Sequence, residues 1–308
     1  MLPETEAQKL RETIPGEGKY IYCIITIDNC ESLNFGPLGI GGRGDELYTI
    51  SYKPEGGGLA FGSQSHKPEG SGWASARPQG HGLASFGQSH SPTHKTIAAV
   101  VSNSPIKKYS VAREYLILHE RAIEEVMKAY TVLPVRFATI AEDEKKVKTI
   151  LEKDYDKILD LLEKMKGKIE LGLKAIFKEG IYNYILKEYE EIRALKEKLQ
   201  KLPLEKSYYQ RMEIGKMVET ALEKEKANLK ENILNNLSPL ALETKTNNTY
   251  GERMIINVAF LVEKNREGEF DQKIQELGAK YEDKVKFKYV GTLPPFNFVN
   301  LVIETGKY

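Results

Sequence analysis

The sequence has few cysteines, since only Cys23 and Cys30 occur in 308 residues. Two cysteines cannot form the multi-disulfide framework of a small secreted scaffold, and the count is typical of a reducing cytoplasm. Neither sign of charge is in excess, because the chain has 45 Lys and Arg residues and 44 Asp and Glu residues, for a net charge of +1. A balanced chain has no broad basic field, so charge alone does not indicate a nucleic-acid-binding protein.

Long hydrophobic runs are also lacking. No apolar stretch approaches the roughly 18 residues that a membrane-spanning helix needs, and the polar leader at residues 1–18 has no apolar core of a secretory signal. We therefore expect a cytoplasmic protein with neither membrane nor nucleic acid among its partners. The composition, 41% hydrophobic and 29% charged, is that of an ordinary globular protein, and the length allows two domains.

A repetitive tract interrupts this ordinary sequence at residues 54–94. The segment KPEG occurs twice, and GLAFGSQSH is followed later by the near-identical GLASFGQSH. The tract contains neither isoleucine nor valine. Such a segment cannot bury enough apolar surface to fold, so we predict a disordered insertion in the loop between strands at 46–52 and 96–101. A sticky aromatic linker is one alternative. Metal capture is another, although the spacing of the candidate ligands fits no compact site; these are His66, His81, His90 and His94.

The remaining pattern predicts an α+β fold of two domains, at residues 19–165 and 166–308. The first domain is expected to contain four strands and two helices: strands 20–27, 46–52, 96–101 and 131–140, with helices 111–128 and 142–165. Pro134 indicates an edge position or a bulge in the last of these strands. On the first helix the apolar stripe contains Leu116, Ile123 and Val126.

The second domain is predicted to be ferredoxin-like, with a long helical hairpin at 181–237 inserted in its first crossover. Its other segments are strand 169–177, loop 235–250, strand 254–262, helix 264–281, strand 285–290 and a terminal strand 298–303. The apolar run MIINVAFLV within this order predicts a strand that is buried on both faces.

Few residues suggest catalysis. Residues 39–44 spell GxGxxG, yet a strand pattern follows where a dinucleotide site requires a helix. The HExxH zinc motif is incomplete at His119, because Ile123 replaces the second histidine. His119 is better explained as a polar neighbour of the helix stripe, although a nucleophilic pair with Cys23 stays open. We expect no enzyme, cofactor or metal site; the alternative is a small-molecule or nucleotide-binding enzyme using the Gly39–Gly44 turn and Cys23.

Several blocks resemble one family. They are GIGGRGDELYTI at 39–50, AAVVSNSP at 98–105, HERAIEEVMKAYTVLPVRFATI at 119–140, and the segment 259–301 ending in VKFKYVGTLPPFNFVNL. Together they resemble the GvpF/GvpL gas vesicle proteins, over nearly the whole chain apart from 54–94 and the helical hairpin. The resemblance implies an accessory protein for the assembly of gas vesicles, the hollow shells that give buoyancy. It also implies two α+β domains, no catalytic residues, and the shell protein GvpA and other gas vesicle accessory proteins as partners.

A protein that keeps a β-rich shell subunit from aggregating needs an edge strand or an apolar groove to cover it. Two segments are candidates for this surface. The first is Arg136 with Phe137, where we favour an ion pair of Arg136 with Glu120 or Glu124 over a partner contact. The second is the turn that contains Pro294, Pro295, Phe296 and Phe298, which is otherwise a packed terminal turn. A coiled-coil adaptor acting through residues 181–237 is a third class of function.

Overall fold

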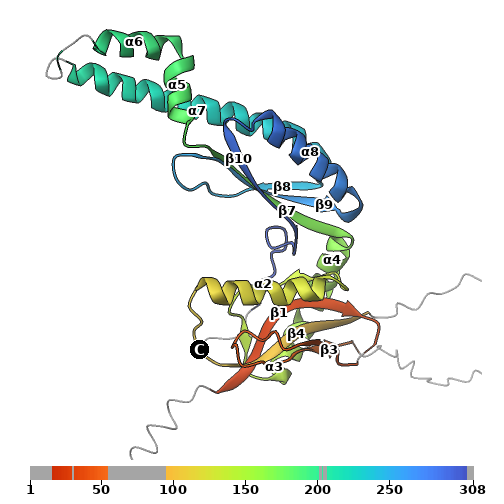
Figure 1. The fold of residues 1–308 in the computed structure, drawn as a ribbon. Coiled ribbons are helices and arrows are strands. Elements are labelled where there is room, and N and C mark those ends of the chain that lie inside the picture. The colour runs from red at the N-terminus through yellow and green to blue at the C-terminus, as the bar shows by residue number, and fades with distance from the viewer. Residues whose placement is uncertain (1–15, 30, 55–94, 201–202, 204–206, 304–308) are drawn as a thin grey trace, which may run out of the picture.

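The structure is a computed structural model that describes residues 16–29, 31–54, 95–200, 203 and 207–303. The predictions made for the polar leader up to residue 15, for Cys30 and for the tract from residue 55 to 94 lie outside these residues. Two antiparallel sheets lie one above the other in Figure 1, with helices on their faces. This mixture confirms the α+β class. Among the described residues, every helix is too short or too polar to cross a bilayer.

The N-terminal sheet has the order β2-β3-β4-β1-β5, and β6 also pairs with β1. Its strands are β1 (Glu17–Ile27), β2 (Asn34–Gly36), β3 (Leu47–Tyr52), β4 (Thr96–Pro105), β5 (Leu133–Pro134) and β6 (Ile140–Ala141). β1 is central because its β-branched and aromatic residues are buried almost throughout. Tyr52 pairs with Ile97 across β3 and β4. The strand residues that flank the repetitive tract therefore lie side by side in the sheet.

Helices cover both faces of this sheet. One face packs against α2 (Arg113–Met127), through Ala122, Ile123 and Val126. The other packs against α3 (Glu144–Lys153) and α4 (Tyr155–Met165). The single helix predicted at 142–165 is wrong, because the chain breaks at Asp154 (φ −106°, ψ 17°). Aspartate is a poor residue for a helix interior, which explains why the break falls there.

The strand predicted at 131–140 is also wrong. Only the two-residue segments β5 and β6 pair with β1, and the chain between them turns away from the sheet. Pro134 has no amide proton to continue the ladder. Four residues later Ala138 has a φ of 62°, a left-handed conformation that no β-strand contains. The turn brings Arg136 and Phe137 out of the sheet.

The C-terminal sheet has the order β10-β7-β9-β8. Its strands are β7 (Lys168–Phe177), β8 (Glu243–Thr246), β9 (Met254–Glu263) and β10 (Val285–Leu293), and its helices are α5 (Ile181–Glu188), α6 (Glu190–Gln200), α7 (Tyr208–Leu237) and α8 (Glu267–Lys280). Short 3-10 turns, η2 (Ser238–Leu240) and η3 (Lys264–Arg266), follow α7 and β9. The predicted helical hairpin is present, and in Figure 1 it extends well beyond the sheet. Its first arm is two helices and not one, because the chain leaves the helical conformation at Tyr189 (φ −85°, ψ 105°).

Two predictions for this half are corrected. The loop predicted at 235–250 contains the end of α7 and the strand β8, whose ETKT sequence is short, polar and at the sheet edge. An edge strand of this kind carries no hydrophobic signal. The predicted terminal strand at 298–303 is instead irregular chain. Phe298 and Leu301 are buried there against the N-terminal half, and Pro294 with Pro295 precludes a regular continuation of β10.

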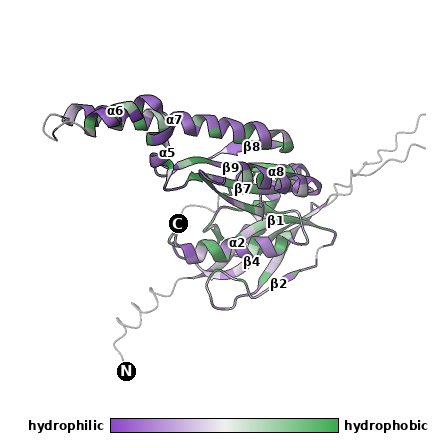
Figure 2. Cartoon of the chain, turned by 45° about the horizontal axis from the view of Figure 1, so that its top comes forward, coloured by the Kyte–Doolittle hydropathy of each residue, from purple (hydrophilic) through white to green (hydrophobic). Residues whose placement is uncertain are grey.

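The core extends through both sheets. Phe260 on β9 packs with the helices of the C-terminal half, whereas its neighbours Ala259 and Leu261 face the core of α3, α4 and the N-terminal sheet. The prediction that this strand is buried on both faces is therefore confirmed. Figure 2 shows hydrophobic colour concentrated on the strands and hydrophilic colour over much of α6 and α7.

Candidate functional site

The turn between β5 and β6 forms one wall of a cleft. The Ala138 amide donates a hydrogen bond of 2.9 Å to the Tyr20 hydroxyl, and the Thr139 hydroxyl donates one of 2.6 Å to the Arg136 carbonyl oxygen. Together with the backbone bonds of Val135 to Tyr22 and of Ile21 to Thr139, these two bonds fix a segment that forms no regular strand. The Arg136 side chain is consequently exposed at the surface, and Phe137 beside it is half-buried.

The C-terminal turn forms the opposite wall. Glu170 on β7 alternates with Ile169 and Leu171, so it points away from the helices of its own sheet. Its carboxylate accepts hydrogen bonds from the backbone N (2.8 Å) and Nδ2 (2.5 Å) of Asn297. Burial raises the pKa of Glu170, and the two bonds from Asn297 act against that shift. On the other side of the turn, the Lys245 ammonium donates 2.7 Å to the Asn297 carbonyl oxygen.

Between the walls lies a cleft of about 780 Å³. Its lining comes from α2, from the 134–137 segment, from β8 and from the C-terminal turn, and includes Leu116, His119, Glu120, Arg136, Phe137, Lys245 and Phe296. The volume lies within the roughly 300–1,000 Å³ of ordinary binding pockets. The cleft combines aromatic surface with a few charged groups.

The ring of His119 contacts aromatic side chains from both walls of the cleft. Its ring lies edge-on to Phe137 at 5.7 Å and tilted to Phe296 at 6.4 Å, measured between ring centroids. Because the Tyr20 hydroxyl accepts from Ala138, its own proton goes to His119 Nδ1 at 3.1 Å. The proton of the ring therefore sits on Nε2 and is donated to the Val135 carbonyl oxygen at 3.2 Å. His119 is thus a buried neighbour of the helix stripe with both nitrogens occupied.

The two surfaces predicted from the sequence converge in this one cleft. Arg136, Phe137 and Phe296 all line it. Pro294, Pro295 and Phe298 are buried instead and support the turn from behind. The favoured ion pair of Arg136 is wrong, because the ion pairs among the described residues include none between Arg136 and Glu120 or Glu124.

Sequence reasoning missed several residues of the cleft. Leu116 was expected in the buried stripe of α2, yet 39% of it is exposed at the cleft. Leu116 is the first residue of the predicted stripe and lies about one helical turn before His119. That position near the start of the helix was the available sequence signal for its exposure. Lys245 lies on the strand that hydropathy did not detect. Glu170 does not line the cleft but fixes its C-terminal turn; it was an isolated acidic residue within the apolar run IELGL, which is a sequence signal for a buried partner.

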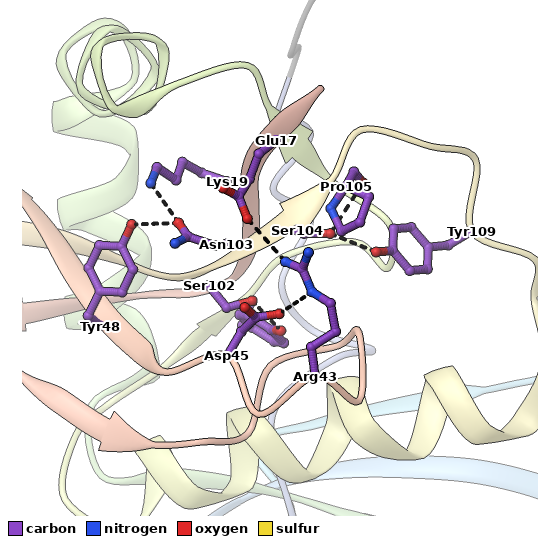
Figure 3. A network of polar contacts seen from close by, with 11 residues as sticks. Glu17, Lys19, Arg43, Asp45, Tyr48, Ser102, Asn103, Ser104, Pro105 and Tyr109 are labelled. Atoms are coloured by element: carbon purple, nitrogen blue, oxygen red, sulfur yellow. Dashed lines mark hydrogen bonds and ion pairs between the residues drawn. The ribbon is translucent and has the colours of Figure 1, made fainter. Parts of the chain in front are cut away.

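The Gly39–Gly44 turn is a structural element held by its neighbours. The Tyr22 hydroxyl accepts 2.7 Å from the Ile40 amide, and the Gly39 amide donates 2.9 Å to the Asp45 carbonyl oxygen. Arg43 bridges Asp45 at 2.8 Å and Glu17 at 3.2 Å, as Figure 3 shows. The strand β3 follows, so this turn does not open a helix whose N-terminus could receive a phosphate.

Cys23 is likewise part of the core. It is fully buried on β1, and burial raises the pKa of its thiol, which keeps it protonated and unreactive. Both nitrogens of His119 are bonded elsewhere, which leaves no base for a Cys23–His119 pair. In the described part of the chain, no three His, Cys, Asp or Glu side chains lie close enough together to hold a metal ion.

The fold and the cleft define an α+β protein whose candidate site is an open, partly aromatic groove shared by two sheets. The sequence model described as gas vesicle synthesis protein GvpL/GvpF matches residues 18–300. The chain therefore belongs to the GvpL/GvpF family, as the sequence blocks predicted. This family is one of gas vesicle proteins and is not a known enzyme family.

Individual relatives agree with this assignment. The chain is 25% identical over 201 residues to gas vesicle protein F of Dolichospermum flosaquae, covering 63% of this chain and 80% of that protein. It is 28% identical over 204 residues to gas vesicle protein F of a Streptomyces species, covering 66% and 84%.

The crystal structure of GvpF from Anabaena sp. PCC7120 matches the fold. The TM-score is 0.65 at 20% sequence identity, over 93% of this chain and all of that one. The crystal structure of GvpF from Microcystis aeruginosa gives a TM-score of 0.60 at 19% identity, over 92% of this chain and 99% of that one. These two likenesses establish the fold.

Proposed function

We propose that this protein is an accessory factor for gas vesicle assembly that binds the shell protein GvpA or other gas vesicle accessory proteins through the cleft. The observation that carries the proposal is the convergence of Arg136, Phe137 and Phe296, distant in sequence, on one groove of a GvpL/GvpF family member. A partner with exposed apolar faces must be covered before it assembles, and an aromatic groove suits that task. The protein acts in the cytoplasm and at the gas vesicle.

A binding role, without catalysis, is supported by the state of the reactive groups. The thiol of Cys23 is buried, and the imidazole of His119 donates and accepts within the core. The amides of Ile40 and Gly39 in the Gly39–Gly44 turn donate to Tyr22 and Asp45. We therefore assign no catalytic residue and no cofactor.

We further infer two domains, at residues 19–165 and 166–308, with a ferredoxin-like C-terminal domain. The strand order β10-β7-β9-β8, with helices after β7 and β9, supports that topology. The hairpin of α5, α6 and α7 occupies the first crossover. The chain from Asn297 to Ile303 then returns to pack on the N-terminal half.

Co-expression with GvpA tests the proposal. An affinity-tagged form of this chain should keep GvpA soluble and co-purify with it, whereas GvpA alone should aggregate. Replacing Phe296, which is 37% exposed in the cleft, by Ser should reduce the co-purified GvpA. Tyr209→Ser is the matched control, because Tyr209 is an exposed aromatic residue on α7 outside the cleft.

The same pair of variants separates the adaptor alternative. Tyr208, Tyr209 and Met212 are exposed together at the start of α7, and this group is the contact surface that the adaptor alternative would use in place of the cleft. Loss of co-purification in Tyr209→Ser but not in Phe296→Ser would favour that role. Removing the whole hairpin is unsuitable as a test, because Leu229 and Ile233 of α7 belong to the core of the C-terminal sheet.

A further inference from the structure

We propose that the cleft recognises a short extended peptide segment in which a bulky apolar side chain stands next to a carboxylate. The inference rests on the proposed function and specifies the chemistry of the partner segment. Arg136 would bind the carboxylate, and the apolar side chain would pack among Leu116, Phe137 and Phe296.

The cationic half of the site is Arg136. Its guanidinium makes no ion pair or hydrogen bond to the residues that the structure describes, although its backbone is fixed by Thr139 and by the neighbouring Ala138 amide. Lys245, the other cation of the lining, already donates to the Asn297 carbonyl oxygen. An arginine offers a planar fork of donors that matches a carboxylate, and a fixed backbone lowers the entropy lost on binding.

Glu120 sets the position of the carboxylate within the cleft. It lies on α2 one turn after Leu116, and burial together with the nearby Glu124 raises the pKa of its carboxyl. A second carboxylate close to this wall would be repelled. An incoming acidic side chain is therefore directed to the Arg136 wall.

The apolar half of the site is formed by side chains that the fold leaves partly uncovered. Leu116 is 39% exposed and Phe296 is 37% exposed, and both face the same cleft as the half-buried Phe137. Single exposed apolar residues are normal on a protein surface, whereas a group of them around a concavity marks a contact site. One bulky apolar side chain of a partner would cover this group.

The charge of the lining favours such a segment over a nucleic acid. Arg136 and Lys245 against Glu120 give the lining a formal charge of +1. Binding to a phosphate backbone depends on many cationic contacts. A single acidic residue, in contrast, is matched by a single unpaired guanidinium.

The test is a titration of the full chain with short fluorescent peptides, followed by anisotropy. The first peptide carries a Leu-Phe pair beside Asp; the others replace Asp by Asn, Asp by Lys, or Leu-Phe by Ser-Ser. We expect the first peptide to bind about tenfold or more tightly than each of the others, the usual size of one charge-assisted bond or one buried apolar anchor.

Variants assign the effect to the cleft. Arg136→Gln should weaken the Asp peptide about tenfold and leave the Asn peptide unchanged. Arg136→Glu should reverse the preference in favour of the Lys peptide, a result that a merely destabilised protein would not give. Arg121→Gln is the matched control, because Arg121 is an exposed arginine on α2 and lies outside the cleft lining.

Equal binding of all four peptides, absence of binding, or unchanged affinities in Arg136→Gln would overturn the inference. These outcomes are distinguishable from failure of the proposed function, because GvpA co-purification is measured independently with the same variants. Retained co-purification with no peptide preference would refute only the recognition chemistry. Self-association of the chain that Phe296→Ser abolishes would identify a second copy as the occupant and would likewise overturn it.

Discussion

The carboxylate of Glu170 accepts hydrogen bonds from the backbone N–H and from the side-chain amide of Asn297, a residue 127 positions further along the chain. This pair fastens the C-terminal turn, and with it Phe296, to the middle of the C-terminal sheet. Glu170 is 3% exposed, so the loss of either bond would not be offset by ready access of solvent to its carboxylate. The geometry of the cleft therefore depends on a side chain that does not line it.

Replacement of Glu170 by Ala is expected to destabilise the protein by about 2–4 kcal/mol, since two part-buried donors of Asn297 lose their acceptor and the buried side chain leaves a cavity. Glu170→Gln keeps one acceptor oxygen and removes the buried charge, so its cost should be clearly smaller. Urea unfolding measures both variants. Faster proteolytic cleavage within residues 296–303 in Glu170→Ala alone would show that the turn is released, and identical cleavage in the two variants would contradict this.

The stability of the protein should depend on His119 in mildly acidic solution. Burial lowers the pKa of the imidazole from 6.5 to about 4. The unfolded chain therefore takes up this proton at higher pH than the folded chain does. The contribution of neutral His119 is fully present above about pH 6.5 and is lost as the pH falls toward 4, by about 3 kcal/mol.

The measurement is the free energy of unfolding at a series of pH values for the wild type and for His119→Gln. The difference between the two curves should be constant above pH 6.5. It should then change in favour of the variant as the pH falls. A difference that stays constant down to pH 4 would contradict a buried neutral His119.

The Gly39–Gly44 turn depends on the Tyr22 hydroxyl. Tyr22→Phe leaves the buried Ile40 amide without its acceptor, at a cost of about 1–3 kcal/mol. Tyr48→Phe is the control, because its hydroxyl makes only a part-buried bond of 3.3 Å to Asn103. Hydrogen exchange should become faster at the Ile40 amide in the first variant only. Unchanged exchange there would mean that the turn is held by other bonds.

Excision of residues 54–94 tests whether the repetitive tract contributes to the fold. Tyr52 already pairs with Ile97, so a tight turn from residue 53 to residue 95 can close the hairpin without a change of register. Stability should stay within about 1 kcal/mol, because loop closure depends weakly on loop length. GvpA co-purification should be unchanged; its loss on excision would assign the tract a function.

The sequence predicted elements that have a strong apolar pattern. β1 and β9 are runs of buried β-branched residues, and the stripe of α2 places Ile123 and Val126 in the core. β8 and the final segment were not predicted correctly. The first is polar because it lies at an edge, and the second is apolar because it packs on the other half of the chain.

In the cleft, too, some residues could be predicted from the sequence and their arrangement could not. Arg136 and Phe296 stood out as an isolated charge in an apolar segment and an aromatic residue beside two prolines. Their meeting could not be predicted, because it depends on the left-handed Ala138 and on the bond between Glu170 and Asn297. Such tertiary relationships leave no local periodicity in the sequence.

Strand β9 restricts how the two halves of the protein can move against each other. Its residues alternate between two cores, with Phe260 in one and Leu261 in the other. A hinge movement of the halves against each other would require one of these contacts to be broken. The protein should consequently melt in a single cooperative step, and the groove should meet its partner as a rigid template whose shape is already set before binding.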